Sequence, residues 1–60
     1  MRLNKFLAQC GIASRRESDR LIQSAMVTVN GVIEDNPAYQ VQPNDDIFYD
    51  NQRISIESNT

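Results

Sequence analysis

The spacing of the apolar residues changes once along the chain, close to residue 26. Before that point, apolar side chains recur at positions i, i+3, i+4 and i+7, which is the spacing of one helix face: Leu3, Phe6, Leu7 and Cys10. After it, the stretch VTVNGVI alternates apolar and polar residues as a strand does. Helices followed by strands predict an α+β domain, with two N-terminal helices packed on one side of a small antiparallel sheet.

Two helices are expected before this change. The first ends at Gly11, which suits the left-handed conformation that follows many helices. The second begins at Arg15, because Ser14 and Glu17 have the spacing of a capping box, in which each side chain binds a free backbone amide. Its apolar arc consists of Ser18, Leu21, Ile22 and Ala25. The arginines lie on the opposite arc, which we expect to face solvent.

Short strands and tight turns are expected in the second half. Asn30 and Gly31 form the dipeptide typical of a type I′ hairpin turn, where both residues need positive φ. Further strands are predicted at residues 39–41, 47–49 and 53–56, with turns at 43–46 and 50–51. A polar tail, ESNT, follows.

The size and chemistry of the chain argue against catalysis by these residues. Sixty residues form one domain at most, and with 40% hydrophobic residues the core is thin and leaves no room for a substrate cavity. The chain has no His and one Cys, so the usual zinc ligand sets, the Ser-His-Asp triad and the Cys-His pair are excluded within it. We expect no catalytic residue, no cofactor and no metal.

The single cysteine also bears on location. Cys10 cannot form an internal disulfide, and its place on the apolar stripe favours a core role over a reactive thiol. The sequence shows no leader and no long apolar run. We therefore expect a cytoplasmic protein without membrane contact. We also expect a monomer.

Charge is divided unevenly along the chain. The first twenty residues hold five basic and two acidic side chains, a net charge of +3, whereas the remaining forty hold one basic and six acidic side chains, a net charge of −5. Such asymmetry indicates an anionic partner that meets one face of the molecule. The basic residues of the first part are Arg2, Lys5, Arg15, Arg16 and Arg20.

The arginines of the second helix occupy positions at which they do not stabilise the helix. Arg15 and Arg16 lie in its first turn, where the helix dipole already carries partial positive charge. Arg16 and Arg20 are like charges at i and i+4. A helix N-terminus with guanidinium groups beside it is, however, well suited to bind phosphate.

A simpler interpretation of this charge run is a solvated surface. In that case Glu17 pairs with Arg20, and Asp19 pairs with Arg15 and Arg16 at helical spacing. The residues alone leave the two interpretations about equal, and Arg2 and Lys5 on the first helix favour phosphate binding modestly.

Three further features have a functional and a structural interpretation. The Asn30 and Gly31 tip could enter a nucleic-acid groove or be only a turn. The pair Asp45 and Asp46 could act as acid and base, but an Asx turn explains it better. The aromatic residues could stack on bases, but core packing is favoured because no Arg or Lys alternates with them: they are Tyr39, Phe48 and Tyr49.

The order of these motifs resembles a known RNA-binding family. The run RLNKFLAQCGIASRRESDRLI, then VTVNG, then NPAYQVQPNDDIFYD is similar to the small domain named after the fourth protein of the small ribosomal subunit. The resemblance covers nearly the whole chain and is most specific from Arg2 through the Ser14 to Glu17 box to Ile22. It implies the α+β fold called the alpha-L RNA-binding motif.

The resemblance also implies a function. The chain is similar to the leading domain of ribosomal RNA pseudouridine synthases, most of all the branch acting on small-subunit ribosomal RNA. Structured ribosomal RNA is then the partner, the catalytic domain follows in the same parent chain, and residues 1–60 are one RNA-binding domain from the N-terminus of a larger enzyme. The implied RNA-contact residues are Arg2, Lys5, Ser14, Arg15, Arg16, Arg20, Asn30 and Gly31.

The chain departs from the family at one place. Members usually carry Gly and a basic residue before the hairpin strand, where this chain has Ala25 and Met26. Two alternative functions stay open: a protein-interaction domain that uses the acidic sheet face, and a stand-alone RNA-binding stress protein associated with ribosomes.

Overall fold

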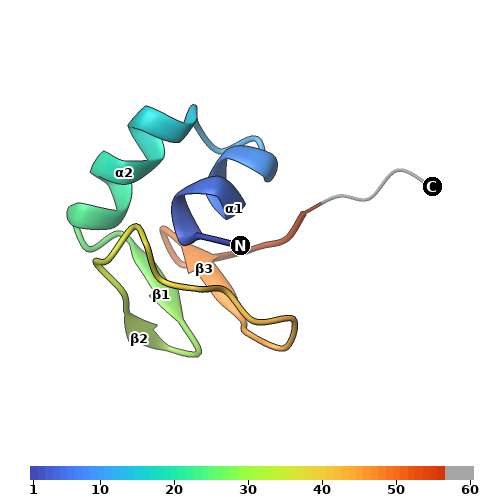
Figure 1. Ribbon diagram of the computed structural model, residues 1–60. Helices are drawn as coiled ribbons and strands as arrows, with labels where there is room; N and C mark the ends of the chain where they lie inside the picture. Colours follow the sequence, from blue (N-terminus) through green and yellow to red (C-terminus); the bar gives the residue numbers. More distant parts are fainter. Residues whose placement is uncertain (57–60) are drawn as a thin grey trace.

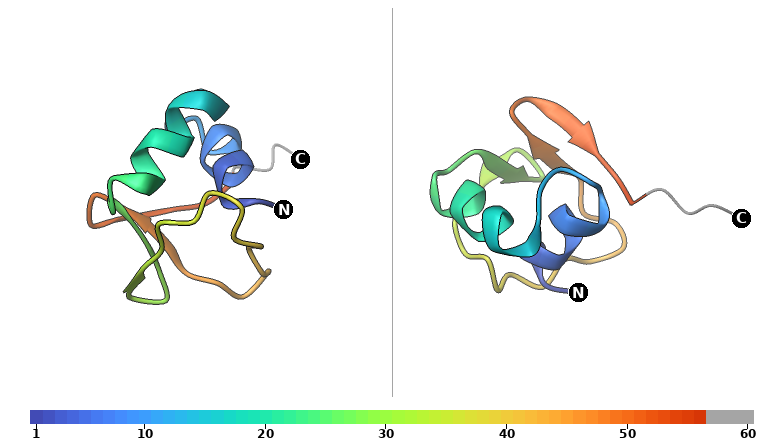
Figure 2. Two further views of the ribbon diagram at one scale, coloured as in Figure 1. Left: turned by 60° about the vertical axis from the view of Figure 1, so that its left-hand side comes forward. Right: turned by 90° about the horizontal axis from the view of Figure 1, so that it is seen from above.

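The fold is seen in a computed structural model, which describes residues 1–56; the polar tail 57–60 lies outside the described residues. Two helices precede a four-stranded sheet and lie together on one side of it (Figure 1). The elements are α1 (Leu3–Gln9), α2 (Arg15–Gln23), β1 (Val27–Val29), β2 (Val32–Ile33), β3 (Ile47–Tyr49) and β4 (Gln52–Ile54). The expected α+β arrangement is confirmed, and the views of Figure 2 show the helices stacked over the strands.

Both helices end in the same hydrogen-bonded motif. After α1, the Gly11 amide donates to Ala8 and the Ile12 amide to Leu7, and Gly11 has φ +77°. This is a Schellman ending, and it confirms the predicted glycine stop. After α2 the same pair of bonds forms, but the left-handed residue is Ala25, with φ +63°.

The capping box at the start of α2 is only half formed. The Oγ atom of Ser14 accepts a hydrogen bond from the Glu17 amide at 3.3 Å, as predicted. The Glu17 carboxylate makes no return bond within residues 1–56 and instead lies 3.9 Å from the Arg20 guanidinium. The Ser14 side chain alone therefore caps the helix.

The sheet is antiparallel throughout, in the order β2, β1, β3, β4. Two-residue turns with positive φ at both positions join β1 to β2 and β3 to β4. Asn30 and Gly31 make the first of these turns, as expected for a type I′ hairpin, and Asp50 and Asn51 make the second. The last strand begins and ends slightly earlier than the predicted range 53–56.

The core lies between the helices and the inner face of the sheet. Val27 and Val29 point inward from β1, and their neighbours across the sheet are Tyr49 and Ile47. Tyr39 and Tyr49 pack partly buried against this core, so core packing is confirmed for both of them. The fully or nearly fully buried apolar residues are Leu3, Leu7, Ile22, Val27, Val29 and Ile47.

Residues 39–41 do not form a strand, contrary to the prediction. They make one isolated bridge, between Arg2 and Gln40, and run beside the residues that enter α1. The Leu3 amide donates to the Tyr39 carbonyl at 2.9 Å, and the Val41 amide donates to the Met1 carbonyl at 2.8 Å. Because α1 begins at Leu3, directly after Met1 and Arg2, the pairing of residues 39–41 with this segment cannot extend into a strand ladder.

The structure also bears on Cys10 and on the length of the helices. Cys10 is half-buried at the end of α1, and burial raises the pKa of its thiol, which favours the core role over a reactive one. Among residues 1–56, both helices are far too short to cross a membrane.

Candidate nucleic-acid interface

One side-chain hydrogen bond joins the two helices and defines their outward face. The Asn4 amide nitrogen of α1 donates to the Asp19 carboxylate of α2 at 2.8 Å. Asn4 is 8% exposed and Asp19 is half-buried, so this bond marks the seam at which the helices meet. On each helix, the side chains that lie further from the core than Asn4 or Asp19 stand on either side of this seam.

Three cations flank this seam. Lys5 is about 100° round α1 from Asn4, on the side away from buried Leu3 and Leu7. On α2, Arg16 and Arg20 are about 140° to 180° round from the centre of the buried pair Ser18 and Ile22. Lys5, Arg16 and Arg20 are all exposed. The helical geometry therefore brings them to one outward face of the helix pair.

The beginning of α2 offers hydrogen-bond donors beside these cations. The backbone amides of Arg15 and Arg16 donate to no group within residues 1–56, as is normal for a first helical turn. The Ser14 hydroxyl oxygen accepts the Glu17 amide, which leaves its hydrogen available to an acceptor. Two free amides, a hydroxyl and the side chain of Arg15 thus surround one helix N-terminus.

The ion pairs differ from those expected of a purely solvated surface. The predicted pair of Glu17 and Arg20 forms, at 3.9 Å between exposed side chains, where a pair contributes little. Asp19 was expected to pair with Arg15 and Arg16, but its carboxylate binds Asn4 instead. Within residues 1–56, four cations of the helical half take part in no ion pair: Arg2, Lys5, Arg15 and Arg16.

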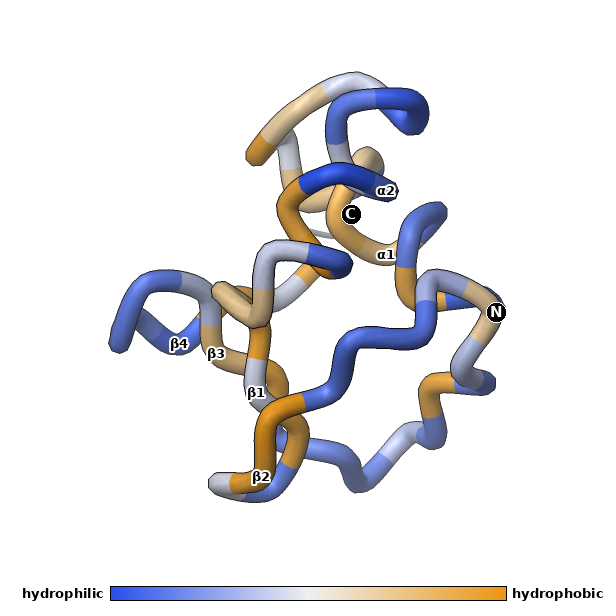
Figure 3. Tube along the Cα trace, turned by 90° about the vertical axis from the view of Figure 1, so that its left-hand side faces the viewer, coloured by the Kyte–Doolittle hydropathy of each residue, from blue (hydrophilic) through white to orange (hydrophobic). Residues whose placement is uncertain are grey.

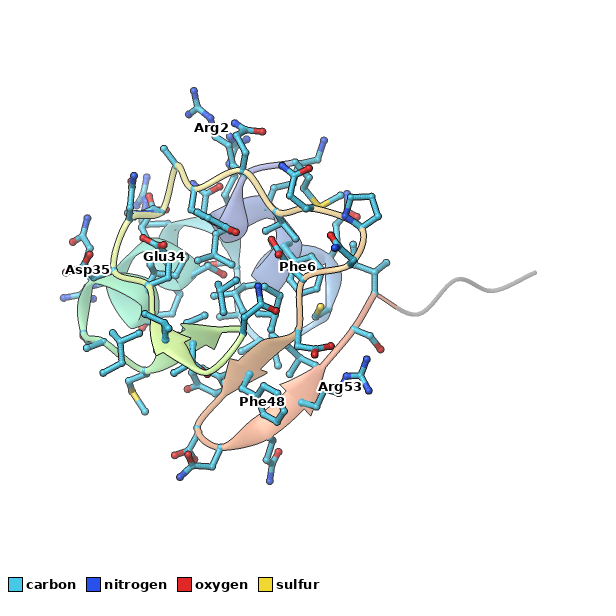
Figure 4. All side chains as sticks on the ribbon, turned by 90° about the horizontal axis from the view of Figure 1, so that it is seen from below. Arg2, Phe6, Glu34, Asp35, Phe48 and Arg53 are labelled. Atoms are coloured by element: carbon cyan, nitrogen blue, oxygen red, sulfur yellow. The ribbon has the colours of Figure 1, made fainter. Side chains whose placement is uncertain are left out.

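Arg2 stands at the other end of the helical half. It is the N-cap residue of α1, and its backbone forms the bridge to Gln40. Its side chain is exposed and extends away from the body of the domain (Figure 4). Since α1 is seven residues long, Arg2 lies about 10 Å along the helix axis from the turn that leads into α2.

Asn30 and Gly31 are not brought to this face. Their turn is at the end of the β1–β2 hairpin far from the helices (Figure 1). The Asn30 side chain donates to the Asp45 carboxylate at 3.0 Å and accepts the Asp46 amide at 2.9 Å. The two hydrogen bonds of the Asn30 side chain therefore hold the hairpin tip against the loop before β3.

Asp45 organises that loop, which supports a structural role over acid and base chemistry. Its carboxylate accepts the Gln42 amide at 2.9 Å and the Tyr39 hydroxyl at 2.7 Å, besides Asn30. The bond from the Gln42 amide, followed by that from Tyr39, holds the pKa of Asp45 below its ordinary value. The same bond to Asp45 raises the pKa of the Tyr39 hydroxyl.

Sequence reasoning missed Asn4 and Asp19 as partners. Asn4 adjoins the apolar stripe of the first helix, and its burial follows only from the contact of the two helices. The one usable signal was an acid, Asp19, at the edge of the apolar arc of α2, where a partner across the helix pair is needed.

With the geometry described, comparison with known proteins decides the family. The model of the S4 domain family matches residues 1–47. The chain belongs to the S4 domain family. The matched residues extend from the N-terminus to the first residue of β3, so the match includes the whole basic helical half and the first hairpin.

Relatives with similar S4 domains are pseudouridine synthases. The dual-specificity RNA pseudouridine synthase RluF of Escherichia coli K12 is 42% identical over 57 residues, which cover 90% of this chain and 18% of that protein. The ribosomal small subunit pseudouridine synthase A of Pasteurella multocida is 35% identical over 54 residues, 90% of this chain and 23% of that protein. A chloroplastic protein of Arabidopsis thaliana, provisionally named a ribosomal large subunit pseudouridine synthase, is 50% identical over 83% of this chain and 12% of its own length.

The fold has a solved counterpart as well. A crystal structure of a pseudouridylate synthase matches with a TM-score of 0.82 at 26% identity, over 88% of this chain and 23% of that one. The chain spans less than a quarter of the length of each of these relatives. It is thus an S4 RNA-binding domain of the type found in pseudouridine synthases.

Proposed function

We propose that residues 1–60 are the N-terminal RNA-targeting domain of a pseudouridine synthase that acts on structured small-subunit ribosomal RNA. The observation that carries the proposal is the outward face of the helix pair, where cations without an ion pair adjoin free amides at the start of α2. A catalytic domain in the same parent chain would carry out the reaction, and the cytoplasm is the compartment we assign to it. The name of the Pasteurella multocida relative supports the small subunit as the target.

The contact residues that we propose fall into two groups. Arg15, Arg16 and Ser14 form the primary phosphate site with the first amides of α2, because all of their donors belong to the first turn of that helix or to its N-cap. The cations Lys5, Arg20 and Arg2 extend the contact along the backbone of a folded RNA. Asn30 and Gly31 stay in the proposal as a separate contact of the hairpin tip.

The mechanism that we propose is positioning. Phosphate contacts fix the orientation of the domain, and the shape of the folded RNA supplies most of the selectivity. Few side chains on this face can recognise base edges, so the choice of uridine belongs to the catalytic domain, which must take the base out of its stack. The S4 domain keeps that domain close to its target.

One pair of charge reversals tests the contact face. Arg16→Glu and Arg53→Glu change the net charge equally, but Arg53 lies on β4, away from the helices. Amide shifts would be followed by NMR while a folded small-subunit ribosomal RNA fragment is added at two salt concentrations. We expect Arg16→Glu to weaken binding about tenfold and to reduce the salt slope by about 0.7 to 0.9, one phosphate contact. Glu suits a first helical turn, so this variant remains folded.

The results separate the alternatives. Salt-sensitive shifts at Lys5 and at the start of α2, weakened by Arg16→Glu and not by Arg53→Glu, support the proposal. Equal loss in both variants would mean nonspecific attraction and would contradict it. The absence of binding would favour a protein-interaction domain, and preference for a large-subunit fragment would change the target. The length of the natural open reading frame distinguishes a targeting domain from a stand-alone stress protein.

A further inference from the structure

Within residues 1–56, no helix covers the outer face of the sheet. The side chains that alternate with the buried ones form a single row across it, Ile33, Thr28, Phe48 and Arg53, which are neighbours in the strand register. Phe48 was expected in the core, but the register places it in this outer row, where it is partly exposed; it lies beside Arg53 in Figure 4. Ile33 is 58% exposed.

A hollow of about 290 Å³ lies at one end of this row. Met26, which is 39% exposed, contributes to its apolar wall together with Ile33. Figure 3 shows β2 as a hydrophobic segment, and both of its residues, Val32 and Ile33, are exposed. The complete lining is Ala25, Met26, Thr28, Ile33, Asp50 and Asn51.

The polar part of the hollow favours a positive charge. Asp50 is exposed at its rim and forms no ion pair within residues 1–56. Ala25 follows the C-terminus of α2, where the helix dipole is negative. The Asp50 amide donates to the Met26 carbonyl at 3.1 Å, so the carboxylate is carried by a turn that is hydrogen-bonded to a residue of the apolar wall.

These features match the two parts of a long basic side chain. The aliphatic stem of an arginine or lysine gains from contact with apolar walls, while its charged head needs an anion near water. An RNA phosphate would meet Asp50 and the negative end of α2 here, and both repel it. We propose that this hollow binds an arginine or lysine side chain of a basic protein segment.

The proposal concerns a surface separate from the RNA-contact face. The hollow lies on the sheet side of the domain, and Lys5, Arg16 and Arg20 lie on the outward face of the helices. One domain can therefore hold RNA and a basic protein segment at the same time. Neither contact depends on the other, so each can fail alone.

The test uses a peptide probe and a substitution that leaves the turn intact. The probe is acetyl-Leu-Arg-Leu-Arg-amide, compared with acetyl-Leu-Glu-Leu-Glu-amide and with a uridine pentanucleotide, each added to the whole 60-residue chain while amide shifts are recorded. The variant is Asp50→Asn, because Asn accepts the left-handed φ of +51° as well as Asp does. Asp35→Asn is the matched control, since Asp35 is exposed and is absent from the lining of the hollow.

We expect the arginine peptide alone to shift the amides of Met26, Ile33 and Asn51. Asp50→Asn should raise its dissociation constant about threefold, which is the size expected of an exposed charge pair. Asp35→Asn should leave the dissociation constant of the arginine peptide unchanged within experimental error. Ile33→Thr should weaken binding of the peptide without disturbing the strand. Equal affinities in Asp50→Asn and Asp35→Asn would overturn the proposal, as would binding of the pentanucleotide at the hollow.

Discussion

Ala25 is the residue whose backbone conformation is least suited to its side chain. It ends α2 with φ +63°, a left-handed conformation that costs a residue with Cβ about 1 kcal/mol. We predict that Ala25→Gly raises the free energy of unfolding by about 0.5 to 1 kcal/mol, because the relief of strain exceeds the added freedom of the unfolded chain. Urea denaturation measures the difference.

The matched control is Ala38→Gly. Ala38 is also exposed in a turn, but its φ is not positive. Glycine at this position adds freedom to the unfolded chain and relieves no backbone strain. We therefore expect Ala38→Gly to lower the free energy of unfolding by about 0.5 kcal/mol. Stabilisation by both substitutions would show that strain at Ala25 is not the cause.

Asp45 makes the stability of the domain sensitive to acid. Its pKa is held below the ordinary value of 3.8 in the folded chain, chiefly by the bond from the Gln42 amide. The unfolded chain therefore takes up a proton first as the pH falls, and the stability present above that value is lost as the pH drops through the folded pKa. We predict that Asp45→Asn is less stable than the natural chain at neutral pH and flattens this acid decline in thermal melts between about pH 6 and pH 2. A decline of unchanged steepness in the variant would contradict this role.

At the scale of elements, the two helices are held in place by one bond as well as by apolar contact. Asp19→Ala leaves the buried Asn4 amide without an acceptor, and the Asn4 oxygen already has no partner within residues 1–56. We predict that Asp19→Ala lowers the free energy of unfolding by about 1 to 2 kcal/mol, whereas Asp19→Asn, which keeps an acceptor oxygen, loses less. Chemical denaturation of both variants gives the comparison, and equal losses would assign the effect to something other than this bond.

The elements that sequence reasoning predicted are those defined by neighbouring residues. Helix α2 follows from Ser14 and its apolar arc, and the first hairpin follows from Asn30 and Gly31, because capping and turn geometry act within a few positions. Residues 39–41 were predicted wrongly, since the backbone partner of Val41 is Met1, 40 positions away, and that of Tyr39 is Leu3, 36 positions away. Distant pairing of this kind leaves no local pattern.

At the scale of the molecule, the same distinction applies to the candidate site. Helical periodicity places Arg15 on the side of buried Ser18 and Ile22, so its exposure follows from its position in the first turn of α2. The exposure of Arg16 and Arg20 could be predicted from periodicity alone. The link between Asn4 and Asp19, which decides that Lys5 shares their face, depends on how two helices pack. The hollow beside Asp50 depends on strand register and on a turn folded against Met26, so it too is absent from any local pattern.

The division of charge between the two halves has a consequence before any contact forms. The first twenty residues carry a net charge of +3 and the remaining forty a net charge of −5, so the domain carries an electric dipole. The electric field of a polyanion orients the diffusing domain so that its helices face the polyanion. Productive encounters then become more frequent than random tumbling allows, even though the chain as a whole is anionic.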